Sequence, residues 1–333
     1  MEQNLIRDSL SDTIETIQFP EALSHSSGKV RESFLLSNGN RAIVVTDRIS
    51  AFDFILGTIP FKGQVLNQIA VFWFEKLNGI VPHHFLSMPD PNISIVKNAK
   101  PLPIEIIVRG YLTGTTKTSA WYAYEHLDRS ICGLKMPHGM IKNQAFETPI
   151  ITPTTKPEIG HDEPISREEI LQRHLVDKKI WECAEAYALR LFEIGQQEAR
   201  KHNLILVDTK YEMGIDCEGN LMVIDEVHTP DSSRYWIADH YEEEIQQWTK
   251  GQKSFLKPKS LDKEFVREAL VQKGYDVEDP NQNPKDLLDD DIRMEASRRS
   301  IDLFERMTGH TFPFPEKKNI KRSEEIEALL QKL

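Results

Sequence analysis

The chain has 333 residues and a formal net charge of -11 at pH 7, with 39% hydrophobic and 28% charged residues. This composition is that of a folded globular protein, and the length favours two or three packed units over one. The acidic balance opposes broad contact with nucleic acid, whose phosphate backbone is bound by clustered Lys and Arg.

Export and membrane insertion are also not expected. The first part of the chain carries several acids and lacks the apolar segment of a signal peptide, and no run of about 18 apolar residues occurs anywhere. Cys132, Cys183 and Cys217 are far apart and odd in number, which fits neither a disulfide framework nor a CxxC metal site. We therefore expect a cytoplasmic protein.

The first expected unit, residues 1–108, is rich in β-strand patterns. The stretches "RAIVVTDRI", "FILGTIPF", "NISIVK" and "PIEIIVRG" are apolar and β-branched, and Gly, Pro and Asn separate them. The stretch "QVLNQIAVFWFEKLNG" instead has helical spacing. The pattern predicts a β-rich lobe crossed by one helix.

The second expected unit, residues 109–238, mixes helices and strands. It begins with a Gly/Thr-rich loop that runs into a helix, "YLTGTTKTSAWYAYEHL", and residues 165–203 predict two further helices by apolar spacing. Residues 136–164 are polar, contain several prolines and are too long for a simple connection. We expect that segment to have a functional role.

The third expected unit, residues 239–333, is helical and acidic. Asp289, Asp290 and Asp291 stand together, which suggests a metal site at first sight. They directly precede the helical stretch "IRMEASRRSIDLFERMTG", and acids are favourable at a helix N-terminus. Capping is therefore the preferred interpretation.

An acidic β-hairpin is predicted within residues 204–236, "LILVDTKYEMGIDCEGNLMVIDEVHTPDSSRYW". Strand alternation places Asp208, Lys210 and Glu212 on one face. A two-residue turn at Glu218-Gly219 or Gly219-Asn220 would bring Glu212 to the same face as Asp225, whereas a three-residue turn would not. Two facing carboxylates suit Mg²⁺ with a nucleotide, although a plain salt-bridged strand pair remains an alternative.

Two glycine-bearing loops predict anion binding. In "SSGKVRESF", Gly28 permits close approach of the backbone to a phosphate and Lys29 and Arg31 supply charge, although a hairpin turn would have the same residues. In "VRGYLTGTTKTSAW", a strand ending at Arg109 leads through Gly114 and Thr115 into a helix. Free amides at a helix N-terminus bind anions, and a capped helix start is the alternative.

Two further polar clusters suggest ligand contacts. "HTPDSSRYW" predicts a helix start at residues 230–233, where Arg234 in the first turn would oppose the helix dipole unless an anion were bound. "TDRISAFDF" places Asp47, Arg48, Ser50 and Asp53 just after a strand, as either a ligand site or a turn.

These motifs occur together and in order, with "FKGQVLNQIAVFWFEKL", "PLPIEIIVRGYLTGT", "ITPTTK" followed by "HDE", "DTKYEMG" and "DEVHTPDSSRYW". The combination resembles the SAICAR synthetase family over residues 28–236, and more weakly beyond. The resemblance implies an α+β fold with a β-rich N-terminal nucleotide-binding lobe, an α/β lobe with the metal and ribotide site, and a helical C-terminal region. The nucleotide site would be kinase-like or ATP-grasp-like and lie between the lobes.

The resemblance also implies the reaction. An ATP-dependent ligase would join the carboxylate of 5-amino-1-(5-phosphoribosyl)imidazole-4-carboxylate (CAIR) to the amine of L-aspartate through an acyl phosphate. A carboxylate is a poor electrophile, and phosphoryl transfer relies on positioning and charge neutralisation. The absence of an evident Ser-His or Cys-His nucleophile agrees with that chemistry.

Site roles follow from the matching motifs. ATP would contact Gly28, Lys29, Val30, Arg31, Glu212 and Asp225, with Mg²⁺ held by the last two. CAIR and aspartate would contact Asp47, Arg48, Ser50, Asp53, Arg109, Gly114, Thr115, Asp231, Ser233 and Arg234. Lys210 and Asp208 would be catalytic. The aspartate pocket stays open among Arg48, Lys62 and the "ITPTTK" to "HDE" segment.

The departures from the family pattern are small, namely Met213 in place of an aromatic residue and Glu32 where Asp is common. Neither removes a predicted ligand. A kinase-like phosphotransferase with another acceptor and a non-catalytic nucleotide-binding protein are the alternatives. The expected partners are small-molecule substrates only, and the expected state is a monomer or a homodimer.

Overall fold

A computed structural model describes residues 2–52, 54–156, 162–261, 263–276, 279, 281–316 and 320–333. The helices are α1 (Glu2–Asp8), α2 (Lys62–Leu77), α3 (Ala120–His126), α4 (Arg167–Gln172), α5 (Lys178–Lys201), α6 (Ala238–Thr249), α7 (Glu264–Gln272), the 3-10 helix η1 (Pro284–Leu287), α8 (Asp290–Thr308) and α9 (Arg322–Leu330). The strands are β1 (Ser24–Ser27), β2 (Arg31–Leu35), β3 (Arg41–Val45), β4 (Arg48–Ala51), β5 (Phe54–Thr58), β6 (Phe85–Asp90), β7 (Ile93–Val96), β8 (Lys100–Tyr111), β9 (Ser130–Ile131), β10 (Leu134–Lys135), β11 (Ala145–Ile151), β12 (Thr154–Thr155), β13 (Leu204–Ile215), β14 (Leu221–Ile224) and β15 (Ser233–Ile237).

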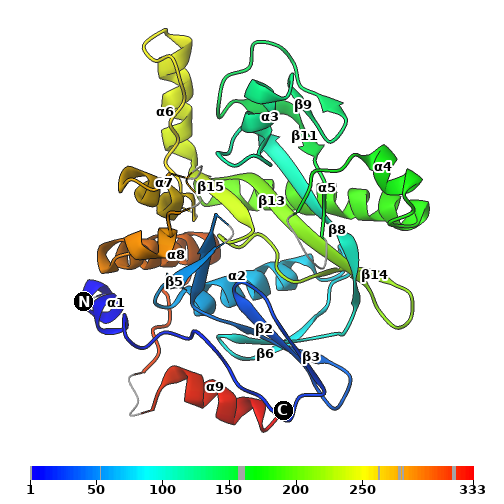
Figure 1. Ribbon diagram of the computed structural model, residues 1–333, viewed down its shortest axis with the longest axis vertical. Coiled ribbons are helices and arrows are strands. Elements are labelled where there is room, and N and C mark those ends of the chain that lie inside the picture. The colour runs from blue at the N-terminus through cyan, green and yellow to red at the C-terminus, as the bar shows by residue number, and fades with distance from the viewer. Residues whose placement is uncertain are drawn as a thin grey trace.

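The N-terminal sheet is antiparallel and has the strand order β1-β2-β3-β7-β6. Alternation along β3 gives it two buried faces. Ile43 and Val45 lie toward α2, whereas Ala42 and Val44 join a separate core under α9. Figure 1 shows α9 outside this sheet and α2 on its inner side. The sheet is therefore covered on both faces.

The second sheet has the order β11-β8-β13-β14, with β12 paired to β8 and β15 paired to β13. Its long strands β8 and β13 run antiparallel through the middle of the molecule (Figure 1). Helix α5 covers one face and starts at Asp177, whose side chain accepts from the Lys179 and Ile180 amides. A Cβ on Gly195 would lie 2.5 Å from both His228 and Leu206, so this helix packs closely on the sheet.

The C-terminal region adds helices to the side of both sheets. Helix α8 packs on α2 and α1, and buries Ile301 and Phe304 in the core shared with α5. Its N-cap is Asp289, which accepts from the Ile292 amide at 3.0 Å, and its C-cap is Gly309 with φ of 72°. The predicted capping role of this acidic cluster is thereby confirmed.

The mixed α+β architecture and the helix pair α4 and α5 agree with the prediction. The predicted helix start at residues 230–233 is wrong, because Ser233–Ile237 forms β15 and the next helix begins at Ala238. Pairing with β13 and burial of Tyr235 and Trp236 outweigh the helix-start pattern. None of the described helices is both long and apolar enough to cross a membrane. The division at residues 108 and 238 stays a prediction.

Candidate active site

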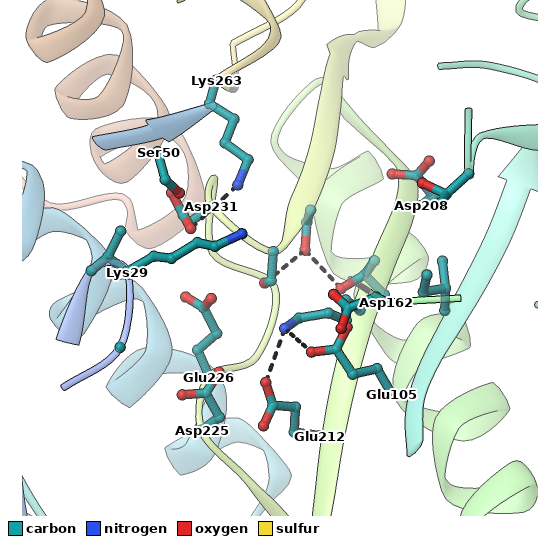
Figure 2. Close-up of a pocket in the computed structure, with 18 of the residues that line it drawn as sticks. Lys29, Ser50, Glu105, Asp162, Asp208, Glu212, Asp225, Glu226, Asp231 and Lys263 are labelled. Atoms are coloured by element: carbon teal, nitrogen blue, oxygen red, sulfur yellow. Dashed lines mark hydrogen bonds and ion pairs between the residues drawn. The ribbon is translucent and has the colours of Figure 1, made fainter. Parts of the chain in front are cut away.

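A cleft of about 830 Å³ lies between the two sheets. Its walls come from β2 and the turn before it, from β8 and β13, from residues 225–234 and from the start of α7. Figure 2 shows the carboxylates of Asp225, Glu226 and Glu212 gathered at one end, with Asp208 farther away. The predicted residues that line the cleft are Gly28, Lys29, Val30, Arg31, Ser50, Arg109, Asp208, Lys210, Glu212, Asp225, Asp231, Ser233 and Arg234.

The turn between β1 and β2 forms one wall. The Gly28 amide donates to the Arg31 carbonyl at 2.8 Å, so the stretch is a hairpin turn that also faces the cleft. Arg31 Nη1 lies 2.6 Å from Asp225 Oδ1, and the guanidinium also pairs with Glu226. Burial opposes the charge of Arg31, but these two carboxylates outweigh it and raise the pKa. The Lys29 side chain extends into the cleft (Figure 2).

Lys210 on β13 is the central cation of the acidic end. Its Nζ donates to Glu105 at 2.7 Å and to Glu212 at 2.9 Å, and Lys156 also pairs with Glu212. Burial lowers the pKa of Lys210, but Glu212 and Glu105 raise it well above its usual value. Burial likewise raises the pKa of Glu212, yet Lys210 and Lys156 prevail and lower it to about 2. Both groups are therefore charged at neutral pH.

The hairpin register differs from the prediction, although Glu212 and Asp225 both line the cleft. The turn spans residues 216–220 rather than two residues, and Glu212 pairs with Ile224. An odd shift of register exchanges the faces of a strand, so the predicted pairing is wrong. Asp225 follows the end of β14 with φ of 67°, and this left-handed conformation turns the chain there. The change of direction places the carboxylate in the cleft.

The acidic end has a donor set that fits Mg²⁺. Five carboxylates, Glu105, Asp162, Glu212, Asp225 and Glu226, line it with the three cations Arg31, Lys156 and Lys210. Burial raises the pKa of Asp225 to about 6; Arg31 opposes this rise, and Glu212 and Glu226 add to it. In the described part of the chain, no three His, Cys, Asp or Glu side chains form a group that could hold a metal. Mg²⁺ commonly takes only one or two carboxylates and completes its coordination with phosphate oxygens and water.

Cations dominate the other end of the cleft. Asp208 on β13 pairs across the sheet with Arg109 on β8 and with Arg234 on β15. Its Oδ2 lies 2.6 Å from Arg234 Nη1 and 3.8 Å from Arg109 Nη1. Arg109 also donates to Thr152 Oγ1 at 2.7 Å, and burial lowers its pKa. One carboxylate thus holds two arginines at the wall of the cleft.

The start of α7 brings further charges to this end. Glu264 lies 3.6 Å from Arg234 and 2.8 Å from Arg267, and it accepts from Thr115 Oγ1 at 2.9 Å. Burial raises the pKa of Glu264, but Arg234 and Arg267 outweigh it and lower the pKa to about 2. Lys263 Nζ lies 3.4 Å from Asp231 (Figure 2). The helical C-terminal region therefore completes the site.

Four predicted substrate residues do not line the cleft, namely Asp47, Arg48, Gly114 and Thr115. Asp47 is buried and accepts from the Ile14 and Gly63 amides at 2.8 and 2.9 Å. A Cβ on Gly114, whose φ is 106°, would lie 2.4 Å from Ser119. Asp47, Arg48 and Gly114 are buried, Thr115 is exposed, and Asp53 lies outside the described residues.

Several cleft residues were absent from the predicted site: Ser26, Phe52, Glu105, Thr116, Thr118, Ser119, Glu226, Lys263 and Arg267. The sequence could have indicated Glu105, because an acid inside the apolar strand pattern "PIEIIVRG" is costly to bury without a partner. Lys156 and Asp162, which also line the cleft, belong to the "ITPTTK" to "HDE" segment that was one candidate for the aspartate pocket. Lys263 and Arg267 carried no such signal, since only tertiary packing brings α7 to the cleft.

The fold and the cleft, with its acidic and basic ends, together have the features of an enzyme that uses a nucleotide and a second anionic substrate. The sequence model of the SAICAR synthetase family matches residues 24–283. The chain belongs to the SAICAR synthetase family.

Relatives of known name agree with this membership. The chain is 44% identical over 289 residues to the phosphoribosylaminoimidazole-succinocarboxamide synthase of Legionella pneumophila strain Lens, covering 86% of this chain and 88% of that one. It is 43% identical over 304 residues to the enzyme of the same name from Bacteroides thetaiotaomicron, covering 91% and 92%. The SAICAR synthase of Saccharomyces cerevisiae complexed with SAICAR aligns with a TM-score of 0.74 and 30% identity, covering 90% of this chain and 100% of that one. A type-2 SAICAR synthetase in complex with ADP has a TM-score of 0.65 and 22% identity, covering 87% and 100%, and shows the shared fold.

Proposed function

We propose that this protein is an ATP-dependent carbon–nitrogen ligase that joins CAIR and L-aspartate into SAICAR and releases ADP and phosphate. Family membership and the names of the relatives support this reaction. The structural observation that carries it is the division of one cleft into an acidic end and a basic end. A metal-bound triphosphate suits the first, and the phosphate of a ribotide suits the second.

The chemistry has two steps. A carboxylate oxygen of CAIR attacks the γ-phosphorus of ATP, and the bond to the bridging oxygen breaks as ADP leaves with the electron pair. The amine nitrogen of aspartate then attacks the carbon of the acyl phosphate, phosphate leaves with the electrons of the C–O bond, and nitrogen loses a proton. Each step accumulates negative charge on phosphate oxygens, so positioned cations lower both barriers.

The nucleotide is assigned to the acidic end. Lys29 and Arg31 supply positive charge to its phosphates from the turn that starts at Gly28. Glu212 and Asp225 would hold Mg²⁺, which neutralises phosphate charge during phosphoryl transfer. Arg31 Nη1 lies 2.6 Å from Asp225 Oδ1. This ion pair connects the turn that would contact the phosphates to one of the residues that would hold Mg²⁺.

The ribotide phosphate is assigned to the basic end. Arg109 and Arg234 supply fork-shaped donors that match a phosphate, and Ser233 lines the same wall. Arg267 from α7 adds a third guanidinium. Asp208 holds both Arg109 and Arg234 by the contacts given above. We therefore assign Asp208 a positioning role and keep Lys210 as the cation nearest the reacting groups.

Aspartate is assigned to the side of the cleft formed by Lys156. Of the three candidates, Arg48 does not line the cleft, and Lys62 is buried with its Nζ 3.0 Å from Asp231. Lys156 does line it and has an exposed side-chain fraction of 41%. An accessible cation is suited to a substrate that binds by its carboxylates. The monomeric or homodimeric state and the cytoplasmic location stay predictions.

The first test is ADP release by the purified protein with Mg-ATP, supplying CAIR and L-aspartate separately and then together. We expect turnover only when both are present, with the succinocarboxamide formed in equal amount. L-Asparagine in place of aspartate is the matched control. ADP release that needs only one acceptor would favour a phosphotransferase, and folded protein that binds Mg-ATP without any turnover would favour a non-catalytic role.

A further inference from the structure

Arg48 is buried behind the cleft, and its guanidinium makes contacts with the turn of residues 28–31, which we call the nucleotide loop. Its Nη2 donates to the Gly28 carbonyl at 2.9 Å and its Nε donates to the Lys29 carbonyl at 3.0 Å. Its Nη1 lies 2.6 Å from Glu32, just beyond the loop. Only 5% of Arg48 is exposed, and the residue does not line the cleft.

The same guanidinium contacts a segment that does not line the cleft. Residues 10–22, which we call the N-terminal strap, cross the outside of the N-terminal sheet. Arg48 Nη1 donates to the carbonyl of Glu15 at 2.6 Å. The neighbouring Asp47 accepts from the Ile14 amide at 2.8 Å, and its own amide donates to the Ile14 carbonyl at 2.8 Å.

The strap is fixed by burial as well as by these hydrogen bonds. Ile14 and Ile17 are each 2% exposed and pack with Phe34, Val44 and Ile326. The carbonyl of Leu10 accepts from Arg293 on α8 at 2.8 Å. The strap is therefore a docked element, although it lies outside residues 24–283, where the family pattern matches.

We propose that Arg48 is a positioning residue that couples the N-terminal strap to the nucleotide loop and thereby sets the affinity for ATP. This inference rests on the proposed assignment of the ATP phosphates to that loop. Carbonyl oxygens repel phosphate, and Arg48 draws the carbonyls of Gly28 and Lys29 toward a residue that is outside the cleft lining. Ordering a flexible turn before the ligand arrives also reduces the entropy lost on binding.

The geometry requires arginine at this position. The fork of five N–H donors serves the Glu15, Gly28 and Lys29 carbonyls and the Glu32 carboxylate at once. A lysine would keep the charge, but its single nitrogen has three donors and cannot serve all four of these acceptors at once. The conservative variant Arg48→Lys therefore removes the coupling without removing the cation.

The test measures the dissociation constants of ADP and of CAIR separately for Arg48→Lys by calorimetry, with amide exchange of residues 28–31 followed by mass spectrometry. We expect ADP to bind about tenfold more weakly, CAIR to change less than twofold, and exchange in the loop to accelerate. Unchanged ADP binding and exchange, or equal losses for both ligands, would overturn the proposal. The second outcome would indicate a general structural role.

Variants in the strap test the coupling from its other end. Ile14→Ala loosens the strap without touching the cleft, and we expect a threefold to fivefold loss of ADP affinity with faster exchange in the loop. Glu15→Ala is the matched control, because the contact uses the backbone carbonyl and the Glu15 side chain is exposed. Unchanged ADP affinity in folded Ile14→Ala would refute the coupling between the strap and the nucleotide loop. If Arg48→Lys does not fold, Ile14→Ala still tests this coupling.

Lys29→Ala separates this inference from the site assignment on which it rests. Weaker ADP binding in Lys29→Ala together with normal binding in Arg48→Lys would refute only the positioning role. Normal ADP binding in Lys29→Ala would instead mean that the nucleotide does not bind at this loop, which would refute the site assignment and the positioning role together. Weaker ADP binding in both variants, with CAIR affinity retained, supports the positioning role of Arg48 and the assignment of the nucleotide to the loop.

Discussion

The two ends of the cleft carry opposite charge, and the central ion of each end lies on the same strand, β13. At the acidic end, Lys210 is placed between Glu105 and Glu212, and the carboxylates lining that end outnumber the cations. At the basic end, Asp208 on the same strand is placed between Arg109 and Arg234. Each end therefore has a central ion of one sign inside a ring of the other sign. The carboxylates of the acidic end are opposite in charge to the Mg²⁺ that we assign to it, and the arginines of the basic end are opposite in charge to the ribotide phosphate.

The pKa shifts show the same contrast. At the acidic end, burial raises the pKa of Asp225 to about 6, so its negative charge is only partly stabilised. At the basic end, burial lowers the pKa of Arg109 and of Lys263. Groups whose charged form is disfavoured in this way gain most when an ion of opposite charge binds. Asp225, Arg109 and Lys263 are therefore prepared for an ion of opposite charge, whereas Lys210 and Lys156 already stabilise the charge of Glu212.

The largest expected effect is at the acidic end. Asp225→Asn removes one proposed Mg²⁺ ligand and should lower turnover at least about a hundredfold, or about 2.7 kcal/mol, because charge on the transferring phosphoryl group is less well neutralised. Steady-state kinetics at saturating Mg-ATP measures it. Glu147→Gln on β11 is the control, since that acid is exposed on a strand away from the metal ligands. Near-normal turnover in Asp225→Asn would exclude Asp225 from the metal site.

At the basic end, the expected effect falls on one substrate. Arg234→Ala should raise the Michaelis constant for CAIR about thirtyfold, or about 2 kcal/mol, because a charge-assisted contact to phosphate is lost and Asp208 loses a partner. The Michaelis constant for ATP should change less than about threefold. Arg190→Ala is a control with an exposed arginine, paired with Glu193 at 2.6 Å. Equal changes for both substrates would mean that the two ends do not act separately.

The sequence predicted the charged residues of β13 better than it predicted their surroundings. Period-two alternation correctly placed Asp208, Lys210 and Glu212 in one cleft, because a strand leaves no other choice once its type is known. The position of Asp225 depended on the length of a turn, and "DCEGN" is compatible with turns of different length. Asp adopts the left-handed conformation more readily than most residues, but the local sequence does not require it at Asp225.

The residues supplied by other segments were harder to predict. Arg48 has the same local pattern whether it faces a substrate or buttresses a loop, and only the packing of the strap decides between these roles. Lys263 and Arg267 come from a helix start with no motif of its own, and their role depends on how α7 docks beside Asp231 and Arg234. Sequence patterns define faces of single elements, whereas a site between elements depends on how they pack.

The smallest expected effect is on the free energy of unfolding, and it can be measured without substrates. The pKa of Asp225 is raised from 3.8 to about 6 in the folded protein. A carboxyl group with a raised folded-state pKa contributes its stability below the unfolded-state value and loses it as the pH rises through the folded-state value. The negative charge of Asp225 should therefore destabilise the protein increasingly between about pH 4 and pH 6, up to a limit of about 3 kcal/mol.

Asp225→Asn removes this penalty, which already includes the attraction of Arg31, and an amide that does not reproduce every contact of the carboxyl group offsets part of the gain. We expect the variant to be more stable than the parent by about 1 to 2 kcal/mol at pH 7.5 without Mg²⁺, with the difference shrinking toward pH 4. Urea unfolding across that range measures it. A variant that is less stable at pH 7.5 would mean that Arg31 fully compensates Asp225. The acidic end would then be neutralised within the protein rather than prepared for a cation.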